Sequence, residues 1–336
     1  MAVARPPEGI MTITDDEALV RATLQGLAEA HDGEALSAAL DDFGFAELLI
    51  ESPQIGVSSL FRAMGRAGSS CGALNDVVTA AFHASTGVDV SEDTLLLPRP
   101  GEDHPALLHD GVIDLRGLCI APRPDRGVLL AAAGQDGLSW LRVAPAASVT
   151  LRQVTGLDPT LTVAESDAAG IHGELVLAGR DAGLAWDSVL AAGRRGLGWQ
   201  IVGGVERMLT LATEHATQRV QFGHAIGSFQ AVRHRLADVS VAQHAAVAAL
   251  DRCGEADDGI FASMVAKSLA GRAARLAGTH CQQVLAGIGF TAEHPFHSYL
   301  KRTMVLDRLL GSSTELPAKI GAVVAAQGTV PRLVEL

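Results

Sequence analysis

The spacing of apolar residues changes twice along this 336-residue chain, and that change limits the folds it can adopt. From Thr14 to about Ser85, and again from Ala185 to Leu336, apolar residues recur at the period of an amphipathic helix. From Thr94 to about Ala182, short apolar runs alternate with Gly, Pro and Asp at the spacing of strands and turns. The sequence therefore predicts an α+β multidomain protein in which one small β domain separates two helical domains.

The predicted domains cover residues 1–87 (all-α), 88–184 (a β-barrel or sandwich) and 185–336 (a bundle of three long helices and a shorter fourth). Chain breakers such as Pro53 set the limits of the individual elements. After the first helix, the expected helices lie at 34–50, 57–67, 73–85, 187–218, 228–253, 258–285, 296–310 and 314–326. The expected strands lie at 95–97, 112–115, 127–132, 139–143, 149–153 and 173–177.

Composition excludes several classes of function. The net charge of -12 argues against a nucleic-acid binder, which needs a basic face to neutralise phosphates. Four scattered cysteines and no apolar signal segment favour free thiols in a reducing cytoplasm, and no run has the length of a membrane span. Twelve histidines occur without metal-ligand spacing, and no nucleophile elbow or P-loop is present, so no metal site is expected.

The stretch from Thr213 to Asp238 has the pattern of one helix ending, a turn and a second helix beginning. Ser228 is expected to be the N-cap of the second helix. At the turn, Arg219, Gln221 and Phe222 place a guanidinium, a carboxamide and an aromatic ring at one corner. Such a corner suits a phosphate-bearing, partly aromatic ligand, because arginine binds phosphate in a bidentate manner. Taken alone, however, the stretch is more typical of a plain helical hairpin that has a surface arginine and a core phenylalanine.

Two later stretches carry similar signals. From Gln283 to Arg302, Gly287 and Gly289 predict a tight turn whose backbone amides a diphosphate or ribose could approach. The same glycines also suit a simple helix C-cap followed by a loop. From Leu309 to Glu315, a glycine and hydroxyl side chains precede another predicted helix, where the usual role of Ser or Thr is N-capping.

These segments together resemble the acyl-CoA dehydrogenases, whose fold has the predicted order of helical domain, β domain and helical bundle. The resemblance covers nearly the whole chain but is weaker in the N-terminal half, where it rests on 42–56 and 157–160. The motifs that carry it are RVQFG at 219–223, IGSFQAVRHRLADV at 226–239, GIGFTAEHPFHSYLKR at 287–302 and LLGSSTEL at 309–316.

The resemblance implies an enzyme that removes the α-proton of an acyl-CoA with a glutamate and passes the β-hydrogen as hydride to FAD, which two subunits share. It implies that Arg219 contacts the diphosphate of an FAD held mainly by a neighbouring chain. The loop from Gln283 to Gly287 would meet the adenosine end of that FAD. The implied cofactor-binding residues are Arg219, Gln221, Phe222, Gln230, Gln283, Ala286 and Gly287.

The departures from the family pattern concern the catalytic base. Most members place the glutamate where this chain has Leu310, and a minority place it where this chain has Gly193. Glu206 lies thirteen residues before Arg219, about 20 Å from the expected depth at about 1.5 Å per residue, so it is expected to be a surface carboxylate. The flavin signature of the family's β domain has no counterpart between 88 and 130. No catalytic residue is therefore assigned.

The resulting hypothesis is a base-less subunit of a heteromeric (α2β2) acyl-CoA dehydrogenase that is active only as a complex. A second acyl-CoA dehydrogenase subunit would supply the glutamate, and an electron-transferring flavoprotein would be the acceptor. By resemblance, actinobacterial heteromers of this kind act on bulky acyl-CoA thioesters such as steroid side-chain CoA. Two other hypotheses remain: a homomeric dehydrogenase with Glu206 as a displaced base, and a non-catalytic structural paralogue. Neither nucleic acid nor membrane is expected as a partner.

Overall fold

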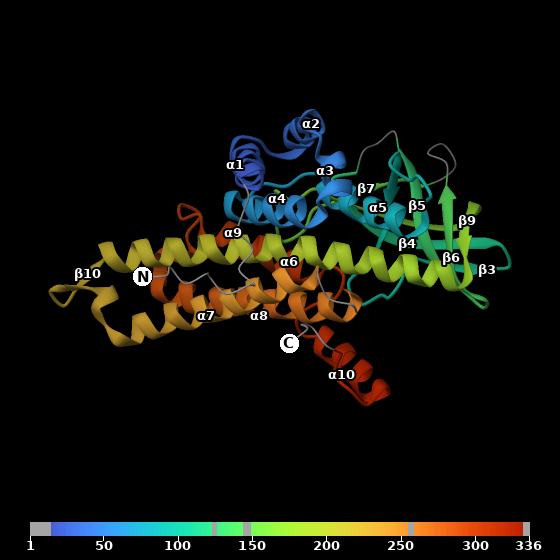
Figure 1. Ribbon diagram of the computed structural model, residues 1–336. Coiled ribbons are helices and arrows are strands. Elements are labelled where there is room, and N and C mark those ends of the chain that lie inside the picture. Colours follow the sequence, from blue (N-terminus) through green and yellow to red (C-terminus); the bar gives the residue numbers. More distant parts are fainter. Residues whose placement is uncertain (1–14, 123–125, 144–148, 255–258, 332–336) are drawn as a thin grey trace, which may run out of the picture.

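In the computed structural model, which describes residues 15–122, 126–143, 149–254 and 259–331, one long helix forms the axis of the molecule. This helix is α6 (Gly179–Gln218), and Figure 1 shows it running from the β strands at one end to a small hairpin at the other. Helices α4 (Pro53–Ala67) and α5 (Ala73–Thr86) pack on one side of it, and α7 (Gln230–Cys253) and α8 (Gly259–Leu285) pack on the other. The predicted fold class, helical, β and helical in sequence, is confirmed.

The N-terminal helices differ from the prediction at two breaks. The single helix expected over 34–50 is two helices, α2 (Gly33–Phe43) and α3 (Phe45–Glu51), which follow α1 (Asp15–Ala30). Gly44 separates them because it adopts a left-handed conformation with φ 81° and ends α2. Pro53 does not merely interrupt a helix but begins α4, since proline lacks only an N–H that the first helical turn leaves unbonded.

The middle of the chain forms one mixed sheet with the strand order β7-β8-β4-β3-β5-β6-β9. Pairs β1–β5 and β3–β5 are parallel, and the other pairs are antiparallel. The prediction missed β3 and β8. Strand β8 reads VAESDAAGI and so contains few of the large apolar residues that mark a strand. The strands are β1 (Asp93–Leu95), β2 (Leu97–Pro98), β3 (Ala106–His109), β4 (Val112–Ile120), β5 (Gly127–Gly134), β6 (Gly137–Val143), β7 (Arg152–Val154), β8 (Val163–Ile171) and β9 (Glu174–Ala178).

The C-terminal helices follow the predicted ranges with shifted ends. After α8 come α9 (Phe296–Arg308) and α10 (Leu316–Gln327). Helix α6 begins at Gly179 instead of Asp187 and so runs through the domain limit placed at residue 184. The domain limits themselves stay a prediction.

Glycines bring α4 and α6 almost into backbone contact. A Cβ atom added at Gly65 would lie 2.1 Å from the carbonyl oxygen of Gln200, and one added at Gly203 would lie 2.1 Å from that of Arg62. Both distances are far below a van der Waals contact, so only glycine allows the two helices to cross this closely. Gly203, one of the glycines that weaken α6 as an isolated helix, is therefore required where α6 packs against α4.

A buried ion pair joins all three parts of the chain. Arg302 on α9 binds the carboxylate of Asp158, and both side chains are almost fully buried. Arg302 also donates through Nη1 to the carbonyl oxygen of Ser69, at 3.0 Å, and through Nη2 to Oγ1 of Thr160, at 2.9 Å. With these donors satisfied, the guanidinium holds the loop before β8 and the segment after α4 against the bundle.

All four cysteines are buried as free thiols. Over the described ranges, no helix combines the length and the apolar character needed to cross a membrane.

Candidate functional site

The predicted corner between α6 and α7 is a two-residue β-hairpin. Strand β10 (Val220–Gln221) pairs in antiparallel fashion with β11 (His224–Ala225). The two residues between them, Phe222 and Gly223, have φ values of 53° and 81°. A turn with positive φ at both central positions matches the twist of its flanking strands, and glycine adopts it without strain. The corner is therefore a defined turn that projects from the end of α6 (Figure 1).

The predicted N-cap at Ser228 is wrong. Ser228 is the last residue of a short 3-10 helix, η1 (Ile226–Ser228), and its Oγ donates to the carbonyl oxygen of Ala225 at 2.7 Å. The next helix, α7, begins at Gln230, with Phe229 as its N-cap residue. The extra turn of η1 moves the helix start two residues beyond the prediction.

The corner presents its functional side chains to solvent. Phe222 is 89% exposed, and its ring meets the ring of the partly exposed Phe229 edge-on, with centroids 6.4 Å apart. This exposure rules out the reading of Phe222 as a core residue. Arg219, Gln221 and Gln230 are also exposed, and within the described part of the chain no acceptor binds the Arg219 guanidinium. Exposed aromatic and unpaired cationic groups at one tip are suited to contact with an anionic, partly aromatic ligand.

The late glycine loop lies at the same end of the bundle as the corner. Helices α7 and α8 are antiparallel neighbours, so the end of α8 lies beside the start of α7. The Nδ1 atom of His280 on α8 lies 3.0 Å from the carbonyl oxygen of Arg235 on α7 and ties these ends together. Gln283, Ala286 and Gly287 are all exposed there. The tertiary structure thus brings two of the three predicted stretches together.

The third stretch lies elsewhere and contains Leu310, one of the two positions at which the resemblance places the base. The other position, Gly193, lies on α6 and packs against it. A Cβ atom at Gly193 would lie only 2.5 Å from Cδ1 of Leu310 and 3.3 Å from Cγ1 of Val78. Leu310 is 5% exposed, and its carbonyl oxygen accepts a 2.9 Å hydrogen bond from Nε of Arg194. Leucine thus fills the space that a glutamate at position 193 would need, and the two base positions pack against each other.

Lys267 holds the loop that carries Leu310, and sequence reasoning missed it. Its side chain is fully buried, and Nζ donates to the carbonyl oxygens of Asp307, at 3.0 Å, and Gly311, at 3.3 Å. Burial lowers the pKa of Lys267 to about 8, although the nearby Asp307 carboxylate acts in the opposite direction. The available signal was a lone lysine on an α8 face that is otherwise built from small and apolar residues such as Met264 and Ala270.

The space next to Leu310 does not fit a flavin of the chain's own. The hollow there measures about 220 Å³, below the roughly 300 Å³ at which ligand pockets begin. Its charged lining is balanced and so does not select for a diphosphate: three carboxylates, Glu102, Asp103 and Glu315, face three cations, Arg99, Arg194 and Lys319. Nη1 of Arg194, one of these cations, is buried without a partner in the described structure, but the hollow is too small to hold a flavin beside it.

The corner and the base positions are too far apart to serve one ligand. Arg219 follows Gly193 by 26 residues of the same continuous helix, which corresponds to about 39 Å at about 1.5 Å per residue. A single dinucleotide cannot touch both places. A cofactor bound at the corner therefore cannot reach this chain's own base positions.

Glu206, the candidate displaced base, is held in a structural network. Its carboxylate accepts from Nη2 of Arg62 at 2.6 Å and from Nε2 of Gln243 at 2.9 Å, and Arg66 lies 3.9 Å away. These partners come from α4 and α7, so Glu206 links both helices to α6. A carboxylate already bound by these donors is poorly placed to remove a proton from a substrate.

Replacing Glu206 with glutamine is expected to reduce stability and leave flavin chemistry intact. The substitution removes the charge that Arg62 and Arg66 share, so the free energy of unfolding should fall by about 1–3 kcal/mol. Urea unfolding measures this loss, with Glu214→Gln, an exposed site on the same helix, as the matched control. If Glu206→Gln instead abolished reduction of bound flavin by an acyl-CoA at unchanged flavin content, Glu206 would be the base.

Comparison with known proteins identifies the family of the C-terminal half. A family model described as the acyl-CoA dehydrogenase C-terminal domain matches residues 183–323. These residues form an acyl-CoA dehydrogenase C-terminal domain. Acyl-CoA dehydrogenase IpdE2 of Mycobacterium tuberculosis is 40% identical over 115 residues, which cover 34% of this chain and 36% of that relative. The match thus spans about a third of the relative's length.

Solved structures extend the acyl-CoA dehydrogenase fold to nearly the whole chain. A chain of the ChsE4-ChsE5 complex from Mycobacterium tuberculosis matches with a TM-score of 0.75 at 21% identity, covering 94% of this chain and 98% of that one. A chain of the Tcur3481-Tcur3483 steroid ACAD G363A variant matches with a TM-score of 0.78 at 18% identity, covering 94% and 99%. The chain therefore has the fold of the FAD-dependent acyl-CoA dehydrogenases, as the motifs predicted.

Proposed function

We propose that this chain is the base-less subunit of a heteromeric FAD-dependent acyl-CoA dehydrogenase. In this proposal its three domains cover residues 1–87, 88–184 and 185–336. The observation that carries the proposal is the packing of Leu310 against Gly193, which leaves neither position able to hold a carboxylate near an acyl-CoA. The partner chain would supply the glutamate and most of the FAD site. The partner would also supply much of the acyl site, since this chain's own hollow beside Leu310 measures only about 220 Å³.

In this proposal the corner completes the FAD site of the partner. FAD supplies the hydride acceptor for desaturation of the acyl group. The guanidinium of Arg219 would bind the diphosphate in a bidentate manner, and Phe222 would cover an apolar part of the cofactor and exclude water. Gln221 and Gln230 would donate to its polar edges. At the adenosine end, Gln283, Ala286 and Gly287 would contribute an amide side chain and backbone groups.

The arrangement proposed is an α2β2 tetramer acting on a bulky acyl-CoA. Support comes from the structural neighbours, since one is a complex of two differently named chains and another is described as a steroid ACAD. We extend this to a steroid side-chain CoA as substrate and to an electron-transferring flavoprotein as electron acceptor. The exposed apolar rings at the corner, Phe222 and Phe229, suit burial by a partner chain.

Co-expression with a neighbouring acyl-CoA dehydrogenase gene product tests the proposal. The complex is expected to bind one FAD for each pair of chains and to oxidise an acyl-CoA, because each pair contains one glutamate and one completed FAD site. The chain purified alone should bind almost no FAD. Native mass spectrometry and flavin absorbance measure the stoichiometry. Stoichiometric FAD and acyl-CoA oxidation by the chain alone would refute the proposal.

A further inference from the structure

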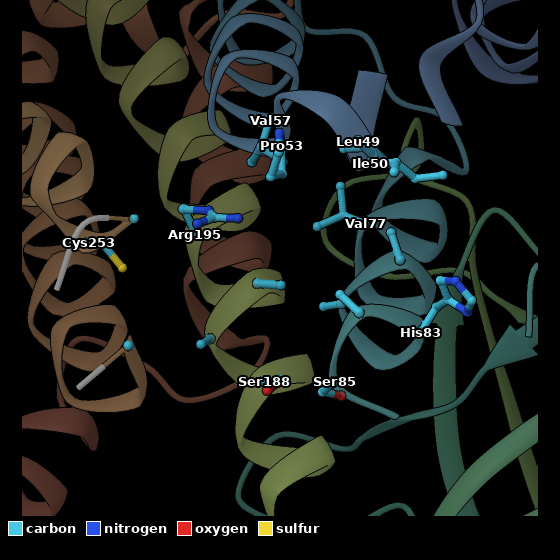
Figure 2. A pocket seen from close by; sticks show the side chains of 17 residues that line it. Leu49, Ile50, Pro53, Val57, Val77, His83, Ser85, Ser188, Arg195 and Cys253 are labelled. Carbon is cyan, nitrogen blue, oxygen red and sulfur yellow. The ribbon is translucent and has the colours of Figure 1, made fainter. Parts of the chain in front are cut away.

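A groove of about 520 Å³ opens on a different side of α6 from Leu310. Figure 2 shows it between α5, α6, the α3–α4 region and the end of α7. Most of its wall is apolar, with Ile50, Val57 and Val77 among the larger side chains and several alanines from α5 and α6. A concave, apolar space of this volume with few polar groups is typical of a small-molecule site.

Arg195 is the charged group of this groove. Its side chain extends from α6 into the space between the helices, near Cys253 (Figure 2). Nε of Arg195 is buried, and no described residue accepts a hydrogen bond from it. None of the described residues that line the groove is acidic. Its other titratable side chains are His83, on the exposed rim, and the buried thiol of Cys253. A buried cationic donor without an acceptor is costly, and a bound anion would remove that cost.

The groove is separate from the base positions. The residues of α6 that line it, Ser188, Ala191, Ala192 and Arg195, are spaced three and four apart and so share one helix face. The Cβ position of Gly193 points instead toward Leu310 and Val78. An occupant of the groove would therefore not lie at either base position.

We propose that this groove binds an apolar carboxylate, with Arg195 as its counter-ion. The hydrocarbon body would lie against the alanines of α5 and α6, and the carboxylate would accept from the guanidinium. This inference goes beyond the proposed dehydrogenase role and does not depend on FAD contact at Arg219. One cation in an otherwise apolar groove is complementary to an apolar ligand that carries a single anionic group. A neutral lipid lacks that group, and a polyanion carries more charge than the groove can neutralise.

Isothermal titration of the full chain with dodecanoate, kept below its micelle concentration, tests the site. The wild type is expected to bind one dodecanoate, and Arg195→Met should weaken binding at least roughly tenfold by removing a charge-assisted hydrogen bond. Arg195→Met should change the binding of dodecan-1-ol, which lacks the carboxylate, far less. Ala191→Phe should abolish binding of both by filling the groove. Arg180→Met, the same substitution at an exposed site on α6, should bind as the wild type.

Several results would overturn the inference. Circular dichroism first establishes that each variant is folded, so that a loss of binding reports on the groove. Failure of the wild type to bind dodecanoate, or equal binding by Arg195→Met, would exclude the carboxylate site. Unchanged binding by Ala191→Phe would place the ligand elsewhere. Loss of dodecanoate binding when the partner subunit is added would make the groove a protein-docking surface instead.

Discussion

Replacing Gly203 with alanine is expected to lower the free energy of unfolding by at least about 4 kcal/mol, a loss seen only for severe core disruption. The new Cβ atom would lie 2.1 Å from the carbonyl oxygen of Arg62 and 2.9 Å from the amide nitrogen of Arg66. Both are backbone atoms, so no side-chain rotation relieves the overlap, and α4 must move away from α6. That movement would also disturb the Arg62–Glu206 ion pair nearby. Urea unfolding followed by circular dichroism measures the change.

The same substitution at Gly183 is the matched control. Gly183 lies in the same helix, but a Cβ atom there would meet nothing within 4 Å. Alanine has the higher helix propensity by about 1 kcal/mol, so Gly183→Ala should slightly stabilise the protein. Opposite effects of one substitution at two glycines of α6 would demonstrate the close crossing. A loss below about 1 kcal/mol for Gly203→Ala would show that α4 and α6 are not packed this closely.

Replacing Arg219 with alanine is expected to weaken FAD binding by the assembled complex roughly ten- to hundredfold, as for loss of a hydrogen bond to a charged group. The guanidinium is exposed at the tip of the corner and has no acceptor among the residues described, so it is available to a diphosphate. For the same reason its removal should leave the unfolding midpoint unchanged. Titration of the apo-complex with FAD, followed by flavin fluorescence, gives the affinity directly and needs no turnover.

Two further variants define the role of the charge at this corner. Arg219→Lys keeps a cation but loses the planar fork, so its affinity should fall between those of the wild type and Arg219→Ala. Arg180→Ala removes an exposed arginine at the opposite end of α6 and should bind FAD normally. Unchanged FAD affinity in Arg219→Ala would favour the structural-paralogue hypothesis, because the corner would then contact no cofactor.

The type of each secondary-structure element was predictable where the periodicity of apolar residues was strong. The residues at which the elements begin and end were predicted less well. Helices α7 and α8 were expected to within two residues at both ends, because their periodic apolar faces extend over many turns, whereas α6 begins eight residues before its predicted start. The errors arose where a local signal was weak or ambiguous. The prediction joined α2 and α3 because it did not recognise Gly44 as a helix end, and it missed β8 because small and acidic residues occupy most of that strand.

The residue types of the candidate site were predictable from the sequence, whereas their arrangement in space was only partly predictable. Residue types at 219–223 indicated a corner for a phosphate-bearing ligand, but the hairpin, the full exposure of Phe222 and the extra turn at Ser228 appeared only in the structure. The glycine loop after Gln283 was recognised separately. Its position beside the corner follows from the antiparallel packing of α7 and α8, which no spacing along the chain reveals.

The sequence by itself determined the order of the helical and β segments and the residue types offered at the corner, because both depend on local spacing and side-chain chemistry. Tertiary structure alone decided what replaces the missing base. Gly193 and Leu310 are far apart in the sequence, yet they fill one space, and Lys267 and Arg194 hold the loop that brings them together. Such contacts depend on how whole helices pack, so only the folded chain shows that Leu310 fills the space beside Gly193.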